Sequence, residues 1–347
     1  RLRAFFLFLL VAGVALLVSC ASGGGTSGAP AAEGGEGKGS QGQSEGHGES
    51  ITLTAVSGWP ETDFEAKELF IFADKVKELS GGKVTIEYKG GPEVIPSFDQ
   101  GEAVRNGVVD MAFLATSYYS KAIPEAAVFT YSPLTWEEMR NSGALDFLNE
   151  IHVQKMNSRI LFGAPGMGYF MYTNRPVDSI DDFKGMRLRG SSTYVPLYKA
   201  LGAEPVNMPA GEIYEALEKG VIDGFGYPLG VTVFGLEEII EYKIDKPEFY
   251  YSNRVGIINE DKWNQLPQGV KDLFVEAGKH VEFEAPKLNQ LKAEEENKVL
   301  REAGVQIIEL PEGEQEAFIQ LALDAGWEDF RQQNPENGEK LEALFRK

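Results

Sequence analysis

The sequence predicts an α/β fold with two lobes and one long helix that spans both. From Ile51 onward, short apolar runs alternate with amphipathic helical patterns, which is typical of strands joined by helices. The segment EAVRNGVVD at residues 102–110 recurs as EALEKGVID at residues 215–223, which indicates two lobes of similar topology. A helical pattern across residues 266–304 is long enough to cross back over both lobes.

The first twenty residues resemble a bacterial lipoprotein export signal. Arg1 and Arg3 precede an apolar run that is typical of a secretory signal and short for a membrane-spanning helix. The run ends in Leu-Val-Ser-Cys, the lipobox pattern, so we expect cleavage to leave Cys20 as a lipidated N-terminus and membrane anchor. A signal peptide with an incidental cysteine is the alternative. Cys20 is the only cysteine, which excludes a disulfide within the chain and a cysteine-based metal or redox centre.

Residues 21–50 are predicted to form a disordered, glycine-rich linker. They are mostly Gly, Ser, Ala and Glu without an apolar period, so they cannot bury enough surface to offset the entropy of ordering the chain. A glycine-rich coil of this length reaches about 30 Å. We therefore expect an exported protein, anchored to a bacterial membrane, with its folded body in the periplasm or otherwise outside the cytoplasmic membrane.

The charge balance restricts what the folded part can bind. The chain has 53 acidic and 33 basic residues, and removal of residues 1–20, with two arginines and no acids, moves the net charge from −20 to −22. This acidity argues against nucleic-acid binding, which requires a basic surface. Capture of an anionic ligand would therefore depend on a positive group placed inside a pocket.

The first lobe is predicted from alternating strands and helices. Strands are expected at 51–58, 83–90 and 108–119, and helices at 63–82 and 97–107. Because helices join these strands, we expect the strands to pair in parallel.

The repeat carries this pattern into the second lobe. Both copies predict a helix that ends at a glycine and leads into a short buried strand. Also in the second lobe, KGMRLRG predicts a strand and TYVPLYKALG the helix after it. A cleft between two such lobes is a favoured ligand site, because the carboxyl ends of strands from both converge there.

The long helical pattern is expected to divide each lobe into two chain segments. Pro286 interrupts it, so we expect a kink or break there. The strand VQIIEL and a helix at 311–333 follow. These assignments give residues 51–170 and 256–303 to the first lobe and residues 171–255 and 304–347 to the second.

Common catalytic signatures are missing from the sequence. It contains no HExxH, no GxSxG elbow, no P-loop and no GxGxxG between a strand and a helix. His152 and His280 stand alone in helical patterns and are predicted to lie on the surface or to cap a helix. We expect no enzymatic activity, no cofactor and no metal. The alternative function is that of a secreted enzyme with Glu93 and Asp223 as an acid-base pair. Asp223 has a counterpart in the repeat, Asp110, which favours a structural role for both residues over catalysis.

Arg187 and Arg189 lie on the same face of the strand predicted from KGMRLRG. Arg189 comes at its end, directly before the turn into the next helix. There it could offer two parallel N–H donors to a carboxylate, reinforced by the helix N-terminus. Pairing with a surface acid is the alternative on this pattern alone.

Four segments carry a resemblance to a known family: GGPEVIPSFDQGEAVRNGVVDMAF, TNRPVDSIDDFKGMRLRG, YKALGAEPVNMP and EIYEALEKGVIDGFGYPL. From Ile51 to about Gln333 the chain resembles the DctP-like substrate-binding proteins of tripartite ATP-independent periplasmic (TRAP) transporters. The resemblance implies a periplasmic-binding-protein fold, type II-like, whose lobes close on a small organic acid and deliver it to TRAP membrane subunits. The family motif KGxxxR places the carboxylate-binding arginine at Arg189 and leaves Arg187 a supporting or surface role. The alternative is a binding protein that works with an ABC importer or a sensor kinase.

Two departures from the family pattern bear on the ligand. Tyr227 stands where the family word DGxxNPL often has asparagine, and Tyr169 falls near the position of a second arginine in many relatives. Without that cation a dicarboxylate would keep an unpaired charge, so we expect a monocarboxylate with an aromatic or hydroxylated body; a C4-dicarboxylate is the alternative. Glu93 would accept a hydrogen bond from the ligand or instead cap a helix. Aromatic side chains on predicted cleft loops would enclose the ligand: Trp59, Tyr118, Tyr169, Tyr194, Phe225 and Tyr227.

Overall fold

The computed structural model describes residues 50–164, 168–208, 210–251 and 254–346. The predicted export signal, Cys20 and all of the predicted linker except Ser50 lie outside the described residues. Within the described part, no helix combines the length and the apolar character needed to cross a membrane.

The first lobe is built on a mixed sheet. Across the described residues it has five strands in the order β2-β1-β3-β10-β4. The parallel pairing expected for the first three strands in sequence is confirmed, because β1 pairs in parallel with both β2 and β3. β10 returns from the second lobe and pairs antiparallel with β3 and β4. The strands are β1 Ile51–Ser57, β2 Val84–Gly90, β3 Met111–Ala115, β4 Ser158–Gly163 and β10 Arg254–Asn259.

The second lobe is built on a second mixed sheet, with six strands among the described residues in the order β11-β9-β5-β8-β6-β7. β6 pairs in parallel with β7 and β8, whereas β5 pairs antiparallel with β8 and β9. The strands are β5 Tyr169–Thr173, β6 Arg187–Gly190, β7 Glu204–Asn207, β8 Gly224–Tyr227, β9 Tyr242–Phe249 and β11 Gln306–Glu309.

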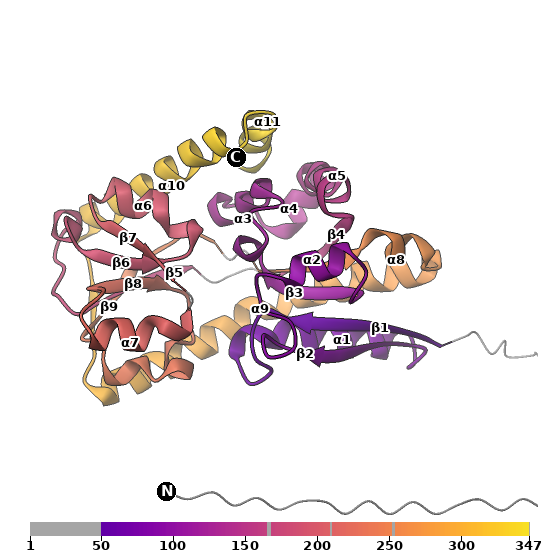
Figure 1. Ribbon diagram of the computed structural model, residues 1–347, viewed down its shortest axis with the longest axis horizontal. Helices are drawn as coiled ribbons and strands as arrows, with labels where there is room; N and C mark the ends of the chain where they lie inside the picture. The colour runs from indigo at the N-terminus through magenta and orange to yellow at the C-terminus, as the bar shows by residue number, and fades with distance from the viewer. Residues whose placement is uncertain (1–49, 165–167, 209, 252–253, 347) are drawn as a thin grey trace, which may run out of the picture. The chain divides into compact units, whose positions relative to one another are not determined.

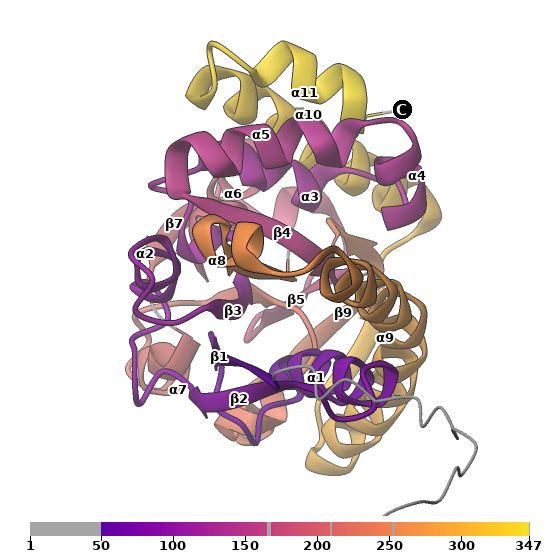
Figure 2. The ribbon, with the colours of Figure 1, turned by 90° about the vertical axis from the view of Figure 1, so that its right-hand side faces the viewer.

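Helices cover both sheets, and short 3-10 turns follow several strands. The α-helices are α1 Lys67–Leu79, α2 Gln100–Arg105, α3 Val128–Tyr131, α4 Trp136–Asn141, α5 Ala144–Met156, α6 Val195–Ala200, α7 Ile213–Glu218, α8 Glu260–Gln265, α9 Gln268–Ala303, α10 Glu312–Gln333 and α11 Gly338–Phe345. In Figure 2, α1 and α5 lie on opposite sides of the strands of the first sheet. The 3-10 turns used below are η1 Phe64–Ala66, η2 Thr116–Tyr118 and η5 Ser192–Tyr194.

The long helix α9 spans both lobes, as the sequence predicted. It packs against α1 and β4 in the first lobe and against β11 in the second (Figure 1). The expected break at Pro286 is absent, because α9 continues through this proline as one helix of 36 residues. α11 was not predicted, and it packs against α3 and α5 of the first lobe although residues 304–347 were assigned to the second.

The sequence repeat is a structural repeat. α2 leads into β3 and α7 leads into β8, with Gly107 and Gly220 at φ +68° and +62° just after the two helices. Glycine adopts this left-handed conformation without steric cost, so it ends each helix at the same point. The next residue, Val108 or Val221, donates its main-chain N–H back to the helix, to the carbonyl oxygen of Ala103 (2.9 Å) or Ala216 (2.8 Å).

The hydrophobic core lies between the sheets and their helices. In the first lobe, the fully buried ring of Phe72 from α1 stacks on Phe162 of β4 at 4.4 Å. His152 also belongs to this interior and not to the surface, contrary to the sequence prediction: it is buried edge-on to Tyr119, and burial lowers its pKa to about 3. Its Nδ1 lies 3.3 Å from the hydroxyl of Ser158.

Candidate functional site

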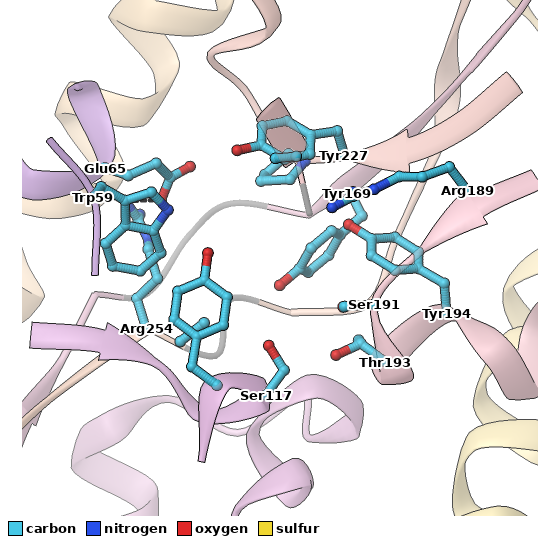
Figure 3. A pocket seen from close by; sticks show the side chains of 14 residues that line it. Trp59, Glu65, Ser117, Tyr169, Arg189, Ser191, Thr193, Tyr194, Tyr227 and Arg254 are labelled. Atoms are coloured by element: carbon cyan, nitrogen blue, oxygen red, sulfur yellow. Dashed lines mark ion pairs between the residues drawn. The ribbon is translucent and has the colours of Figure 1, made fainter. Parts of the chain in front are cut away.

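A pocket lies where strand ends from the two sheets converge. It encloses about 590 Å³, counted out to its open mouth. Its walls come from the carboxyl ends of β3, β6 and β8 and from the first residues of the antiparallel strands β5 and β10. Figure 3 shows the side chains turned toward a common centre. The lining residues are Trp59, Glu65, Ala115, Ser117, Tyr118, Tyr169, Arg189, Ser191, Thr193, Tyr194, Ala210, Tyr227, Pro228 and Arg254.

Arg189 is held at the second-lobe wall of this pocket. It lies in β6 and is 5% exposed. Its Nε donates to the carbonyl oxygen of Met208 at 3.0 Å, and its guanidinium lies 6.0 Å from the ring of Tyr227. No acidic side chain of the described residues forms an ion pair with it. No hydrogen-bond partner of the two terminal nitrogens is found among the described residues, and Figure 3 shows these nitrogens turned toward the pocket.

Two glycines let aromatic rings pack close to the strands that carry Arg189 and Tyr227. A Cβ on Gly190 would meet Tyr194 at 2.7 Å, and a Cβ on Gly226 would meet its ring at 2.4 Å. The hydroxyl of Tyr198 donates to the carbonyl oxygen of Arg189 at 2.9 Å and accepts from the N–H of Gly226 at 2.7 Å. This hydroxyl bridges β6 and β8 next to the pocket and fixes the backbone at Arg189.

Four tyrosines form most of the aromatic wall. Tyr169 and Tyr194 meet edge to face with ring centroids 5.4 Å apart, and Tyr118 lies 5.7 Å from Trp59. Burial raises the pKa of Tyr118, Tyr169, Tyr194 and Tyr227. Their phenols are therefore neutral at physiological pH, and each can donate or accept one hydrogen bond while its ring excludes water.

The first-lobe wall contains a charged cluster that the sequence reasoning missed. Arg254, the first residue of β10, is 4% exposed and forms ion pairs with Glu65 at 2.7 Å and Glu68 at 3.0 Å. Burial raises the pKa of both glutamates, although Arg254 opposes this effect. Arg254 is thus a second arginine at the pocket, but unlike Arg189 it is already compensated by acids of the protein.

The structure separates the sequence candidates into two groups. Arg189, Tyr227, Trp59, Tyr118, Tyr169 and Tyr194 line the one pocket, and their role in binding stays a prediction. Phe225 does not line it: the ring is fully buried and stacks on Tyr172 at 4.9 Å in the core of the second lobe. Glu93 does not line it either, because its Oε1 accepts the main-chain N–H of Gly91 in a local turn. The hydroxyls of Ser117, Ser191 and Thr193 also line the pocket and carried no signal in the sequence.

Arg187 and Asp223 pair with each other and stabilise the fold. The carboxylate of Asp223 accepts the main-chain N–H of Arg187 at 2.9 Å and its Nη2 at 2.8 Å. Asp110 holds the equivalent place in the first lobe, where it accepts the main-chain N–H of Thr54 at 2.8 Å. Neither Glu93 nor Asp223 lines the pocket, so they do not form the acid-base pair considered from the sequence. Within the described residues, no three His, Cys, Asp or Glu side chains gather as a metal-binding group.

A larger hollow of about 1580 Å³ lies between α4 and α9, away from the strand ends. Its lining residues Arg140 and Glu282 pair with each other at 2.5 Å. The smaller pocket is therefore the better candidate for an anion site, because it contains an arginine that has no acidic partner among the described residues.

Comparison with known proteins identifies the family. The model of the family described as bacterial extracellular solute-binding protein, family 7 (DctP), matches residues 55–333. The monocarboxylate 2-oxoacid-binding periplasmic protein of Nostoc sp. is 23% identical over 259 residues, which cover 70% of this chain and 69% of the relative.

Solved structures share the fold. DctP7 of Bordetella pertussis, an extracytoplasmic solute receptor binding pyroglutamic acid, has a TM-score of 0.73 at 21% identity, covering 86% of this chain and 100% of that one. A TRAP periplasmic solute-binding protein of Desulfovibrio salexigens with bound orotic acid has a TM-score of 0.77 at 20% identity, covering 86% and 98%. These likenesses confirm the predicted two-lobed binding-protein fold.

Proposed function

The chain belongs to family 7 of the bacterial extracellular solute-binding proteins, the DctP family of TRAP transporters, and we propose that it captures a small organic monocarboxylate between its lobes. Arg189 would receive the carboxylate, and the aromatic wall would enclose the rest of the ligand. The captured acid would pass to the membrane component of a TRAP transporter, and no bond of the ligand would be made or broken.

The observation that carries this proposal is the buried guanidinium of Arg189, which has no acidic partner among the described residues. Leaving a charge buried without a counter-charge costs several kcal/mol, so the site favours an anion. A carboxylate can accept two parallel N–H bonds from an arginine, and such charge-assisted bonds are stronger than neutral ones. Nearby hydroxyls from Tyr169, Tyr194 and Thr193 can satisfy the remaining oxygen lone pairs.

The preference for a single carboxylate rests on Arg254. This second arginine already pairs with Glu65 and Glu68, so it offers no uncompensated positive charge to a second ligand carboxylate. The named ligands of the comparison proteins agree with this reasoning: pyroglutamic acid and orotic acid each carry one carboxyl group, and the Nostoc relative is named for monocarboxylate 2-oxoacids.

Capture requires the lobes to open and close. The pocket walls come from both sheets, and Arg189 and Tyr227 are almost fully buried, so a ligand must enter through a more open state. A ligand that touches both walls would stabilise the closed state through contacts that the open state lacks. A lipid on Cys20 would keep the protein near its transporter.

The proposal is tested by titration calorimetry with a panel of organic acids, using the wild type, Arg189→Gln and Arg187→Gln. Arg189→Gln should weaken the binding of any captured acid at least 100-fold, as expected for loss of about 3 kcal/mol in charge-assisted hydrogen bonds. Arg187 lies outside the pocket lining and pairs with Asp223, so Arg187→Gln is the matched control and should change affinity less than threefold. Unchanged affinity in Arg189→Gln would contradict the proposal.

A further inference from the structure

The first-lobe wall of the pocket holds more acids than bases. Arg254 is paired with Glu65 and Glu68, and Asp63 lies in the same segment as the two glutamates; all four residues are at most 4% exposed. Asp63 accepts the main-chain N–H of Glu65 at 3.1 Å, which holds η1 at the pocket edge. Burial raises the pKa of Asp63, Glu65 and Glu68, which is the response expected of acids gathered around a single arginine.

Glu65 is the acid of this cluster that faces the ligand space. It is 2% exposed and lines the pocket, whereas Asp63 and Glu68 do not. Its Oε2 contacts Arg254, but its buried Oε1 accepts no hydrogen bond from the described residues. Figure 3 shows the Glu65 carboxylate on the wall opposite Arg189, with an oxygen turned toward the pocket. An unpaired buried acceptor costs about 1–3 kcal/mol, so a donor from a ligand would relieve it.

Arg189 and Glu65 lie at two ends of one small pocket. Burial raises the pKa of Tyr118 first; the charge of Glu65 raises it further and the charge of Arg189 lowers it. Tyr227 is under the same two influences. Both phenols are therefore close enough to feel both charges, and both line the same pocket.

We propose that Glu65 determines the specificity of this site by accepting a hydrogen bond from a donor at the far end of the ligand. The ligand class is then an acid with one carboxylate at Arg189 and a hydroxyl, an amine or another N–H group at Glu65. This inference rests on the proposed function, because it assumes that a carboxylate occupies the Arg189 end.

The same geometry disfavours a second carboxylate. It would lie beside Glu65 and find no cation of its own, because Arg254 is already shared by Glu65 and Glu68. A buried carboxylate without a counter-charge costs several kcal/mol. Arg254 is a positioning residue here: it fixes one oxygen of Glu65 and leaves the other for the ligand.

Two matched series of acids test this inference by calorimetry: benzoate, 4-hydroxybenzoate and terephthalate, and hexanoate, 6-hydroxyhexanoate and adipate. Within a series only the far end changes, from hydrogen to hydroxyl to carboxylate. The hydroxyl member should bind about 10- to 100-fold more tightly than its unsubstituted partner, and the dicarboxylate most weakly.

The matched variant is Glu65→Gln, which leaves Arg254 paired with Glu68. It should reduce the discrimination against the dicarboxylate at least tenfold, whereas a residue that only supports the fold would weaken all three members equally. The wild-type order alone decides the question if this variant does not fold.

The possible failures are distinguishable. If acids without a far donor bind as tightly as acids with one and Arg189→Gln abolishes both, the role of Glu65 is wrong and carboxylate capture stands. If only acids lacking a far donor bind, the inference is equally contradicted. If no carboxylate binds, the proposed function fails and the inference fails with it.

Discussion

Arg254 and Glu65 form a buried ion pair at 2.7 Å on the wall of the pocket that faces Arg189. Glu68 contacts the same guanidinium at 3.0 Å, so two acids share one base. The two arginines of the pocket therefore differ in charge balance: among the described residues, Arg254 has two acidic partners and Arg189 has none. This difference supports the monocarboxylate that we propose as the ligand, and the cluster around Arg254 also affects stability.

The stability of the protein should fall as the pH rises from 5 to 9. Burial raises the pKa of Glu65 to about 8 from an ordinary value of 4.5. Between these values the folded state keeps a proton that the unfolded state releases, so raising the pH favours unfolding by on the order of 1–3 kcal/mol. Urea denaturation at pH 5, 7 and 9 measures this trend.

Glu65→Gln is the control for that pH dependence. The amide does not titrate, so the slope of stability against pH should flatten in this variant. Acids whose pKa is lowered, such as Asp223, do not confound the comparison, because they titrate below pH 5. An equally steep slope in Glu65→Gln would assign the effect to other groups.

Gly226→Ala should weaken ligand binding, although glycine 226 itself offers no side chain to a ligand. The new Cβ would lie 2.4 Å from the Tyr194 ring and 2.7 Å from the Tyr198 hydroxyl, so both must shift. Overpacking of this kind costs about 1–3 kcal/mol, and the displaced Tyr194 would disturb the wall beside Arg189. Affinity by calorimetry and the midpoint of urea denaturation measure the two effects.

Gly220→Ala, six residues earlier, is the matched control. Gly220 has a φ of +62° with open space around it, so alanine there strains the backbone by about 1 kcal/mol without touching the pocket. We expect lower stability and unchanged affinity. If Gly220→Ala weakened binding as much as Gly226→Ala, the steric explanation would be wrong.

The elements that sequence alone predicted are those set by local patterns. The repeat could be recognised because a helix, a left-handed glycine and a buried strand follow one another within a few residues. The place of Arg189 in the pocket could be predicted from the family motif KGxxxR together with its position at a strand end, because carboxyl ends of parallel strands favour a cleft; the strand pattern alone left a surface ion pair equally open.

Features that depend on distant contacts could not be predicted. Arg254 begins a strand that returns from the other lobe, and its partner Glu65 lies 189 residues earlier; the only signal was an arginine directly before the apolar run VGII. Phe225 and Tyr227 alternate onto one face of β8, yet only the residue at the strand end reaches the pocket. Pro286 did not break α9, because packing against both lobes outweighs the local cost of proline.

Cys20→Ala should release the protein from the membrane. The residues Leu-Val-Ser-Cys predict lipidation at Cys20, and alanine removes the sulfur that would carry the lipid. We expect the wild type to partition into the detergent phase of a Triton X-114 extraction and the variant into the aqueous phase. Ser19→Ala keeps the cysteine and a small residue before it and is the control; equal partitioning of the wild type and Cys20→Ala would contradict the anchor.

Asp223→Asn and Asp110→Asn should lower stability by similar amounts without changing ligand affinity. Asp223 accepts the main-chain N–H of Arg187, and Asp110 accepts that of Thr54, so each carboxylate joins the strand after its repeat helix to a parallel neighbour. The loss of such a charged acceptor costs about 1.5–3 kcal/mol. Urea denaturation and calorimetry together separate this structural role from an acid-base role of Asp223 in an enzyme. The enzyme alternative would instead require Asp223→Asn to keep its stability and to change the chemical fate of a bound acid. Asp223 would then have to reach the ligand, but it pairs with Arg187 and does not line the pocket.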